Sequence, residues 1–280
     1  VGRVKGGSWM GGDRDGNPSV AAPVAREVLL LARWMAADLD LRDVEDLLAD
    51  LSMKAASDEL LAATGPTHEP YRVLLRDVRS RLRLTRRQME AQVEGLPVPE
   101  GDAYLRREEL MAPLQMLDRS LRAVGLSDIA DGDLKNTLRR LNCFGITLLR
   151  LDIRQESTRH SEVLDAITRY LQLGSYNDWD EAARQAFLVD ELQARRPLID
   201  DAFRDSEHCT PEVAEVVDTC EVIAEQGSEG LGAYVISMAT TPSDVMAVML
   251  LQKIAGVREP MRVVPLFETL DDLDGAEQTM

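Results

Sequence analysis

Two charged residues follow apolar segments whose pattern predicts β-strands. Arg154 comes directly after Ile153, the last residue of one apolar run, and Glu268 comes directly after the run Arg262–Phe267. A guanidinium can hold a phosphate or a carboxylate through two parallel hydrogen bonds, and it stays charged at every working pH. A carboxylate can ligate Mg²⁺ or Mn²⁺, which prefer hard oxygen ligands. The two residues therefore suggest an anion site at Arg154 and a metal site at Glu268.

Each of these residues also has a purely structural interpretation. Arg154 can pair with the neighbouring acids Asp152 or Glu156 at the rim of a sheet. Glu268 can be a surface residue that begins a helix beside the acidic pair 271–272 (Asp271 and Asp272). Position in the sequence does not separate these interpretations from the functional ones.

A third candidate region is the segment GSWMGGDRDGNP, from Gly7 to Pro18. Its glycines allow sharp bends and close approach, while Asp13, Arg14 and Asp15 present charge. The spacing matches neither GxGxxG nor GxxxxGK[ST], so we reject both nucleotide motifs. An EF-hand calcium loop beginning at Asp13 requires a glutamate where Val24 stands. Composition and spacing alone leave the role of this segment open.

The three histidines provide little further chemistry. His68, His160 and His208 lie far apart and show no metal-ligand spacing. His160, next to Arg159, belongs to the helical stretch after the first predicted strand, so it is the only one expected near the site. We favour a structural role for it over a catalytic one.

The elements that must position these residues are strands alternating with helices. Apolar runs predict strands over Ile146–Ile153, Ala233–Ala239 and Arg262–Phe267, and each is followed by a helical pattern. The sequence TPSD at 241–244 supplies an N-cap, a first-turn proline and a first-turn acid for the second of these helices. Such alternation favours a parallel sheet, in a barrel or an open doubly wound fold, with functional residues at the carboxyl ends of the strands.

The preceding region, from Pro18 to about Leu141, has a helical period throughout. One predicted helix begins near Pro18, and its apolar stripe is expected to face a core. Three more helices are expected over 41–51, 71–89 and 105–121. The stripe of the first helix consists of Val24, Val28, Leu31, Met35 and Leu39.

Seven arginines mark the third of these helices, around Arg79. They can form a basic stripe for phosphate or for an acidic partner. We favour a solvated face whose arginines pair with carboxylates of neighbouring helices, because aromatic stacking residues are absent from that face.

Composition restricts the classes of function. The 280 residues, 45% of them hydrophobic, can fill one or two cores. Subtracting 49 acidic from 32 basic side chains gives −17, which disfavours nucleic acid and anionic membranes as partners. Three cysteines without a CxxC pair suggest neither a disulfide framework nor a zinc site. With no apolar run of about 20 residues and no signal-peptide segment, we expect a cytoplasmic protein.

Four segments together resemble the bacterial type of phosphoenolpyruvate carboxylase. In the order of that family they are GSWMGGDRDGNP, CFGITLLRLDIRQESTRH, AYVISMATTPSDV and VVPLFETLDDL. The resemblance covers essentially the whole chain from Gly7 onward. It implies a predominantly helical α/β protein in which a partial (β/α)8 TIM-like barrel carries a large all-helical excursion. The expected parts are a barrel strand and loop (1–18), a helical region (19–141) and βα units (142–280).

The resemblance also implies an activity and roles for residues. Phosphoenolpyruvate and bicarbonate would give oxaloacetate and phosphate, with Mg²⁺ or Mn²⁺ as cofactor. Glu268 corresponds to a metal ligand, and Arg154 to an arginine beside metal and substrate. Asp13, Arg14 and Asp15 correspond to a block that shapes the site. For a full-length parent the family implies a homotetramer.

Parts of the family's machinery fall outside this sequence. Its general-base histidine lies upstream of the GGDRDGNP block, and its second metal-binding aspartate and glycine-rich loop lie downstream of Met280. The chain also begins at Val1 and stops inside an expected helix. We therefore expect a segment of a longer protein that does not catalyse carboxylation by itself. The alternatives are a helical interaction module that binds an acidic partner through the arginine-rich helix, and another enzyme of phosphoenolpyruvate or pyruvate on a related barrel.

Overall fold

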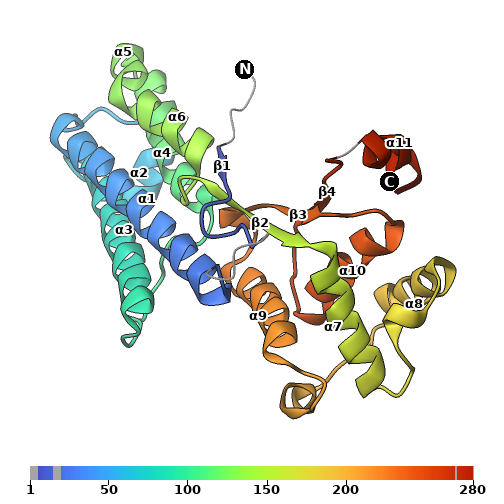
Figure 1. The fold of residues 1–280 in the computed structure, drawn as a ribbon. Coiled ribbons are helices and arrows are strands. Elements are labelled where there is room, and N and C mark those ends of the chain that lie inside the picture. Colours follow the sequence, from blue (N-terminus) through green and yellow to red (C-terminus); the bar gives the residue numbers. More distant parts are fainter. Residues whose placement is uncertain (1–5, 15–19, 269, 280) are drawn as a thin grey trace. The chain divides into compact units, whose positions relative to one another are not determined.

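The computed structural model describes residues 6–14, 20–268 and 270–279 of the chain (Figure 1). It is mostly helical and contains one small parallel sheet. The chain divides into two compact units, one formed mainly by Leu29–Leu149 and the other by Gly7–Val28 with Arg150–Met280. Within the described ranges, no helix combines the length and the apolar character that a membrane span requires.

The sheet of the second unit has four parallel strands, each bonded to the next one along the chain. This arrangement confirms the predicted parallel α/β organisation. Beyond β1, Asp13 forms a further parallel bridge with Arg154, so the glycine-rich segment continues alongside β2. The strands are β1 (Gly7–Ser8), β2 (Arg150–Glu156), β3 (Leu231–Ser237) and β4 (Arg262–Pro265).

The position of β2 differs from the prediction. The apolar run predicted a strand over Ile146–Ile153, but β2 begins at Arg150 and continues to Glu156. The run is misleading because its first residue, Ile146, packs into the core of the helical unit. Within β2 burial alternates: Ile153 is buried in the core, whereas Arg154, next along the strand, is partly exposed. Arg154 therefore lies inside the strand and not beyond its end.

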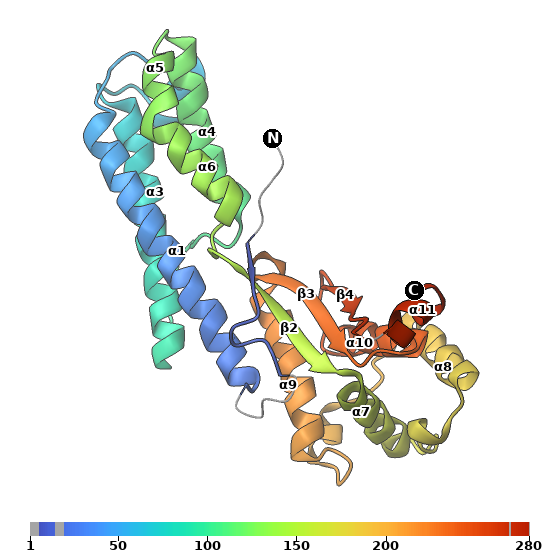
Figure 2. The ribbon, with the colours of Figure 1, turned by 45° about the horizontal axis from the view of Figure 1, so that its top comes forward.

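Helices cover one face of this sheet (Figures 1 and 2). They are α7 (Ser157–Tyr170), α9 (Pro211–Gln226) and α10 (Pro242–Ile254), with α8 (Glu181–Gln193) packed on α10. The capping box of Thr241 and Asp244 confirms the predicted start of α10. Shorter elements of this unit are the 3₁₀ turns Tyr176–Asp178, Asp201–Asp205 and Ser228–Gly230, and helix α11 (Leu270–Thr279).

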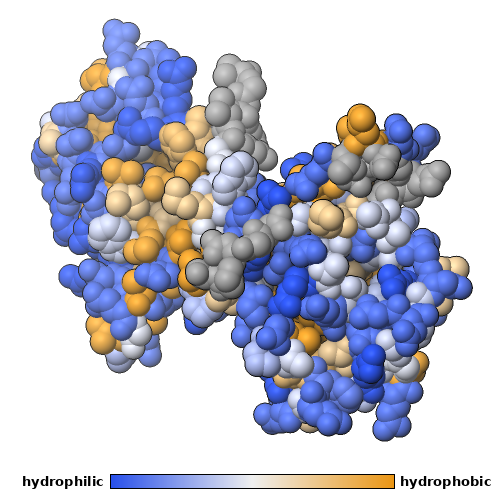
Figure 3. All heavy atoms as spheres, in the orientation of Figure 1, coloured by the Kyte–Doolittle hydropathy of each residue, from blue (hydrophilic) through white to orange (hydrophobic). Residues whose placement is uncertain are grey.

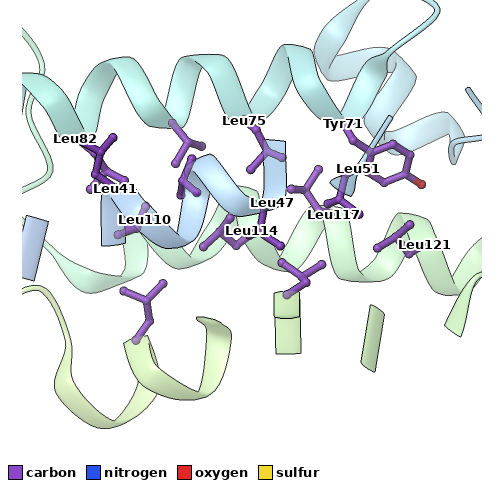
Figure 4. Close-up of a cluster of buried hydrophobic side chains, with 14 of the residues drawn as sticks. Leu41, Leu47, Leu51, Tyr71, Leu75, Leu82, Leu110, Leu114, Leu117 and Leu121 are labelled. Carbon is purple, nitrogen blue, oxygen red and sulfur yellow. The ribbon is translucent and has the colours of Figure 1, made fainter. Parts of the chain in front are cut away.

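In the described part of the other unit, helices are the regular elements, joined by loops, and no strand occurs. Leucines of α1, α3 and α4 form its core, and Figure 4 shows them meeting between the helices. Inside this core the hydroxyls of Tyr71 and Ser120 lie 2.9 Å apart, so each buried polar group has a partner. The helices are α1 (Ala22–Asp50), which belongs to this unit from Leu29 onward, α2 (Asp58–Thr64), α3 (Pro70–Glu94), α4 (Arg107–Ala123), α5 (Ser127–Ile129), a π-helical turn (Ala130–Leu134) and α6 (Lys135–Phe144).

Helix α1 corrects two expectations. It continues to Asp50, so the predicted second helix is part of it, because no glycine or proline interrupts residues 39–41. The predicted core stripe is wrong in its later part: Leu31, Met35 and Leu39 are 44%, 41% and 42% exposed, whereas Val24 and Val28 are partly buried. Apolar residues surround this part of the helix, so their period does not select one face. The face that is buried carries Ala25, Leu29, Leu30, Ala36 and Ala37. Pro18, where this helix was expected to begin, lies outside the described residues.

The arginines of α3 confirm the interpretation as a solvated, paired face. Arg83 Nη2 lies 2.8 Å from Glu45 Oε1, and Arg86 Nη1 lies 2.7 Å from Asp38 Oδ1. Arg72, Arg76 and Arg81 likewise pair with carboxylates. Pairs of this kind contribute little stability each, but they compensate the charge of five of the seven arginines.

Close approach to Asp152 explains two glycines, Gly12 of the GSWMGGDRDGNP segment and Gly232 of β3. A Cβ on Gly12 would lie 2.1 Å from the carbonyl oxygen of Asp152, and a Cβ on Gly232 would lie 2.1 Å from Asp152 Oδ1. The Asp152 carboxylate accepts a 2.7 Å hydrogen bond from the Ala233 N–H, where the pairing of β2 with β3 is irregular. Glycine therefore leaves room for the backbone and carboxylate of Asp152.

We predict that Gly12→Ala lowers the free energy of unfolding by about 3 kcal/mol, because the new methyl group must displace backbone atoms of β2. Gly7→Ala is the matched control, since its Cβ would lie 3.5 Å from Asp152 Oδ2, an ordinary contact. Urea unfolding followed by circular dichroism measures both variants. Equal losses in the two variants would contradict the proposed close approach.

Candidate functional site

Arg154 is held at the centre of the candidate site by backbone pairing. Its N–H donates to the carbonyl of Gly12 at 2.8 Å, and its carbonyl accepts from the N–H of Arg14 at 2.9 Å. These bonds make residues 12–14 a neighbour of β2 and put Asp13 in register with Arg154. The Arg154 side chain is 28% exposed, which leaves it reachable from solvent.

Two carboxylates face this guanidinium. Arg154 Nη2 donates to Glu268 Oε1 at 3.2 Å, although the two residues are 114 positions apart in the sequence. Asp13 Oδ1 lies 3.8 Å from Arg154 Nε, within ion-pair distance. The carboxylate of Asp152, an alternative partner on sequence grounds, accepts instead from β3. The structure thus brings three of the predicted site residues, Asp13, Arg154 and Glu268, into one cluster.

The surroundings of Glu268 suit a ligand role as well as the ion pair. Its side chain is 45% exposed and follows β4, before α11 begins at Leu270. The side chains of residues 271 and 272, which the sequence placed beside it, lie outside the described part of the structure.

Arg14 takes a different position from Asp13. Its side chain is 2% exposed, and Nε lies 2.9 Å from Glu215 Oε1 of α9. Its Nη1 and Nη2 atoms are buried and make no hydrogen bond with the described residues. Arg14 therefore fixes the segment to the helical layer and stands apart from the exposed cluster. Asp15, the third predicted residue of this segment, lies outside the described residues.

Sequence reasoning did not find Glu215 as the partner of Arg14. It lies on α9, which carries several acids at three-residue spacing. Nothing in that pattern distinguishes Glu215 from the other acids. Only the packing of α9 under the 12–14 segment gives it this role.

His160 is fully buried, in agreement with the structural interpretation. Its Nε2 lies 2.9 Å from the hydroxyl of Tyr234 in β3. Burial, with a smaller contribution from the charge of Arg159, lowers the pKa of His160 to about 3. Burial also raises the pKa of Tyr234 well above its ordinary value. Both groups are therefore neutral across the physiological range, and they connect α7 to the sheet.

The residue types of the cluster suit an anion and, with only two carboxylates, an incomplete ligand set for a divalent cation. A guanidinium reachable from solvent can exchange its carboxylate partner for a phosphate. No group of three or more His, Cys, Asp or Glu side chains suited to a metal occurs among the described residues. Mg²⁺, however, usually takes only one or two protein carboxylates and fills its other positions with water and substrate oxygens. The carboxylates of Asp13 and Glu268 fit such an incomplete donor set.

A parallel sheet with helices on one face and a charged cluster built on its strands defines an α/β protein with a candidate site for anionic ligands. Comparison with known sequences narrows this class. A sequence model of the phosphoenolpyruvate carboxylase family matches residues 2–280, so the chain belongs to that family.

Several relatives are named phosphoenolpyruvate carboxylase. The protein of Alcanivorax borkumensis is 93% identical over 277 residues, which cover 99% of this chain and 31% of the relative. The protein of Marinobacter nauticus is 54% identical, covering 100% of this chain and 31% of the relative. That of Pseudomonas aeruginosa is 55% identical, covering 98% and 31%. The chain therefore spans about 31% of the length of these relatives.

We predict a pH-dependent stabilising contribution from His160. Its folded pKa of about 3 lies below the ordinary value of 6.5, so the folded state binds fewer protons between these values. The contribution is complete above pH 6.5 and falls by roughly 1.4 kcal/mol per pH unit as the pH decreases. The stability advantage of the parent chain over His160→Gln should therefore shrink from pH 7 to pH 5.

Urea unfolding at several pH values measures this difference. His208→Gln is the matched control and should track the parent chain across the range. A constant gap between the parent and His160→Gln would show that the buried imidazole does not titrate in this way.

Proposed function

We propose that this chain supplies part of the active site of a phosphoenolpyruvate carboxylase, which forms oxaloacetate and phosphate from phosphoenolpyruvate and bicarbonate. One observation carries the proposal: Arg154 and Glu268 meet at 3.2 Å across the sheet of the second unit. Membership of the carboxylase family, and the names of relatives that match nearly the whole chain, support it.

In this proposal Arg154 is the catalytic residue that binds the transferring phosphate. Its guanidinium offers two parallel donors, and it exchanges Glu268 for phosphate oxygens when substrate arrives. Asp13 stays beside Nε and keeps the planar group oriented. Fixed positive charge at this position stabilises the negative charge that develops during transfer.

The carboxylates of Glu268 and Asp13, which lie beside the same guanidinium, would hold Mg²⁺ or Mn²⁺. When bound, the ion supplies positive charge for the phosphate and the enolate oxygen. Arg14 shapes the site indirectly, since its buried pairing with Glu215 holds the backbone that carries Asp13. We assign Asp15 to the same site-shaping block on the resemblance alone.

We further propose that the four strands belong to a (β/α)8 barrel. Their parallel order follows the chain, and helices cover one face, as in such barrels. The pairing of β1 with β2 supports residues 19–141 as a helical excursion between a first barrel segment at 1–18 and the βα units of 142–280. The full-length enzyme would be a cytoplasmic homotetramer.

A chimera tests the proposed function. The corresponding segment of the full-length Alcanivorax borkumensis relative is replaced by this chain, and oxaloacetate formation is coupled to NADH oxidation. We predict that the chimera is active and that the 280-residue chain by itself is not. Arg154→Gln and Glu268→Gln should each lower kcat/KM by about a hundredfold or more, because each removes a charge fixed in the site.

Arg262→Gln and Glu277→Gln are the matched controls, since both residues are exposed in the same unit. They should leave kcat/KM nearly unchanged. Glu268→Gln should also raise the Mn²⁺ concentration needed for half-maximal activity, whereas the controls should not. An active Arg154→Gln chimera, or equal losses in the controls, would refute the assignment.

A further inference from the structure

The helical unit contains a cavity outside the site described above. It measures about 630 Å³ and is bordered by α1, α6 and the turn after α6. Its walls are mainly apolar and include Leu39, Phe144, Leu148 and Leu149. Cavities of this size, with apolar walls and few polar groups, are typical of sites for small organic ligands.

Among the charged side chains that line the cavity, one acid has no ion-pair partner in the described part of the chain. Asp43 pairs with Arg140, whose Nη2 lies 2.6 Å from Asp43 Oδ2. Arg42 pairs with Asp38, at 2.6 Å. Asp40 remains: its residue is 9% exposed, and its buried Oδ2 has no hydrogen-bond partner among the described residues. A cation is the ligand that complements this lining.

The position of Asp40 is costly in the absence of a ligand. Burial, together with the charge of Asp43 and against that of Arg140, raises the pKa of Asp40 to about 7. An unpartnered buried carboxylate destabilises a fold, and a neutral side chain of similar size would avoid the cost. A bound cation would supply the missing partner.

The mouth of the cavity is apolar as well. Leu39, Phe144 and Leu149 are 42%, 48% and 44% exposed. In Figure 3 hydrophobic atoms gather on this unit where α1 and α6 lie. The cavity therefore combines a wide apolar opening with two lining acids, of which Asp43 is paired with Arg140 and Asp40 has no ion-pair partner among the described residues.

We propose that this cavity binds a small amphipathic cation: an alkyl or aryl body that fills the apolar space and carries one primary ammonium group paired with the Asp40 carboxylate. The apolar walls account for the body, and Asp40, a lining acid with no ion-pair partner among the described residues, accounts for the charged group. This assignment is independent of the carboxylase function and concerns only the helical unit.

Isothermal titration of the 280-residue chain with 2-phenylethylamine tests the proposal, and 2-phenylethanol serves as the uncharged probe of similar shape. We expect saturable binding of the amine at one site, at least about tenfold tighter than that of the alcohol, since each tenfold step corresponds to about 1.4 kcal/mol. Asp40→Asn should weaken the amine to the level of the alcohol. Asp46→Asn, an exposed acid on the same helix, should leave both affinities unchanged.

Urea unfolding at several pH values is the second measurement. It shows whether Asp40→Asn folds, and whether the Asp40 carboxyl of the parent chain is buried. The folded pKa of about 7 exceeds the ordinary 3.8, so the parent chain loses stability as the pH rises between these values. Asp40→Asn should lack this loss and be the more stable chain at pH 8. Arg42, Asp43 and Arg140, the other charged groups of the lining, are unchanged in the variant.

Three results would overturn the proposal. Equal affinity for amine and alcohol would remove the role of charge, and amine binding unchanged in Asp40→Asn would place it elsewhere. Absence of saturable binding would show that the cavity is not a site for such a ligand, whatever the association state in sedimentation. Self-association that increases with concentration would then indicate that the apolar face packs against a second copy of the chain.

Discussion

The candidate site depends on the backbone pairing of residues 12–14 with β2. The two hydrogen bonds between this segment and Arg154 fix Asp13 beside the guanidinium, and they require the chain to pass within contact distance of Asp152. Glycine at position 12 permits that approach. The buried pairing of Arg14 with Glu215 then ties the same segment to α9. One short stretch thus joins the exposed cluster to the interior.

Along β2, side chains alternate between the buried core and a partly exposed face, and the charged cluster lies on the exposed face. Ile153 enters the core, whereas Arg154 and its partners Asp13 and Glu268 stay reachable from solvent. Two carboxylates orient the guanidinium, and ion pairs at this degree of exposure contribute little free energy each. The buried His160–Tyr234 contact, in contrast, is neutral and serves the fold.

Helix α1 shows why hydrophobic period is an incomplete guide. Its apolar residues surround the helix, so a stripe at three- and four-residue spacing can be drawn on more than one face. The core uses the face rich in alanine, and the later part of the predicted stripe, with Leu39, remains exposed beside the Asp40 cavity. Similarly, the apolar run before β2 contains Ile146, which packs among helices, so the strand begins later than the run.

The sequence by itself determined the all-helical region, the alternation of strands and helices, the start of α10 and the family, because these depend on local composition and on motifs in order. It also pointed to Arg154 and Glu268. Only the tertiary structure decided which groups meet: the Arg154–Glu268 contact, the burial of Arg14 against Glu215 and the unpartnered Asp40 all involve side chains brought together, or left without partners, by packing. Local sequence cannot specify these outcomes, since distances between remote residues are fixed only when the elements pack.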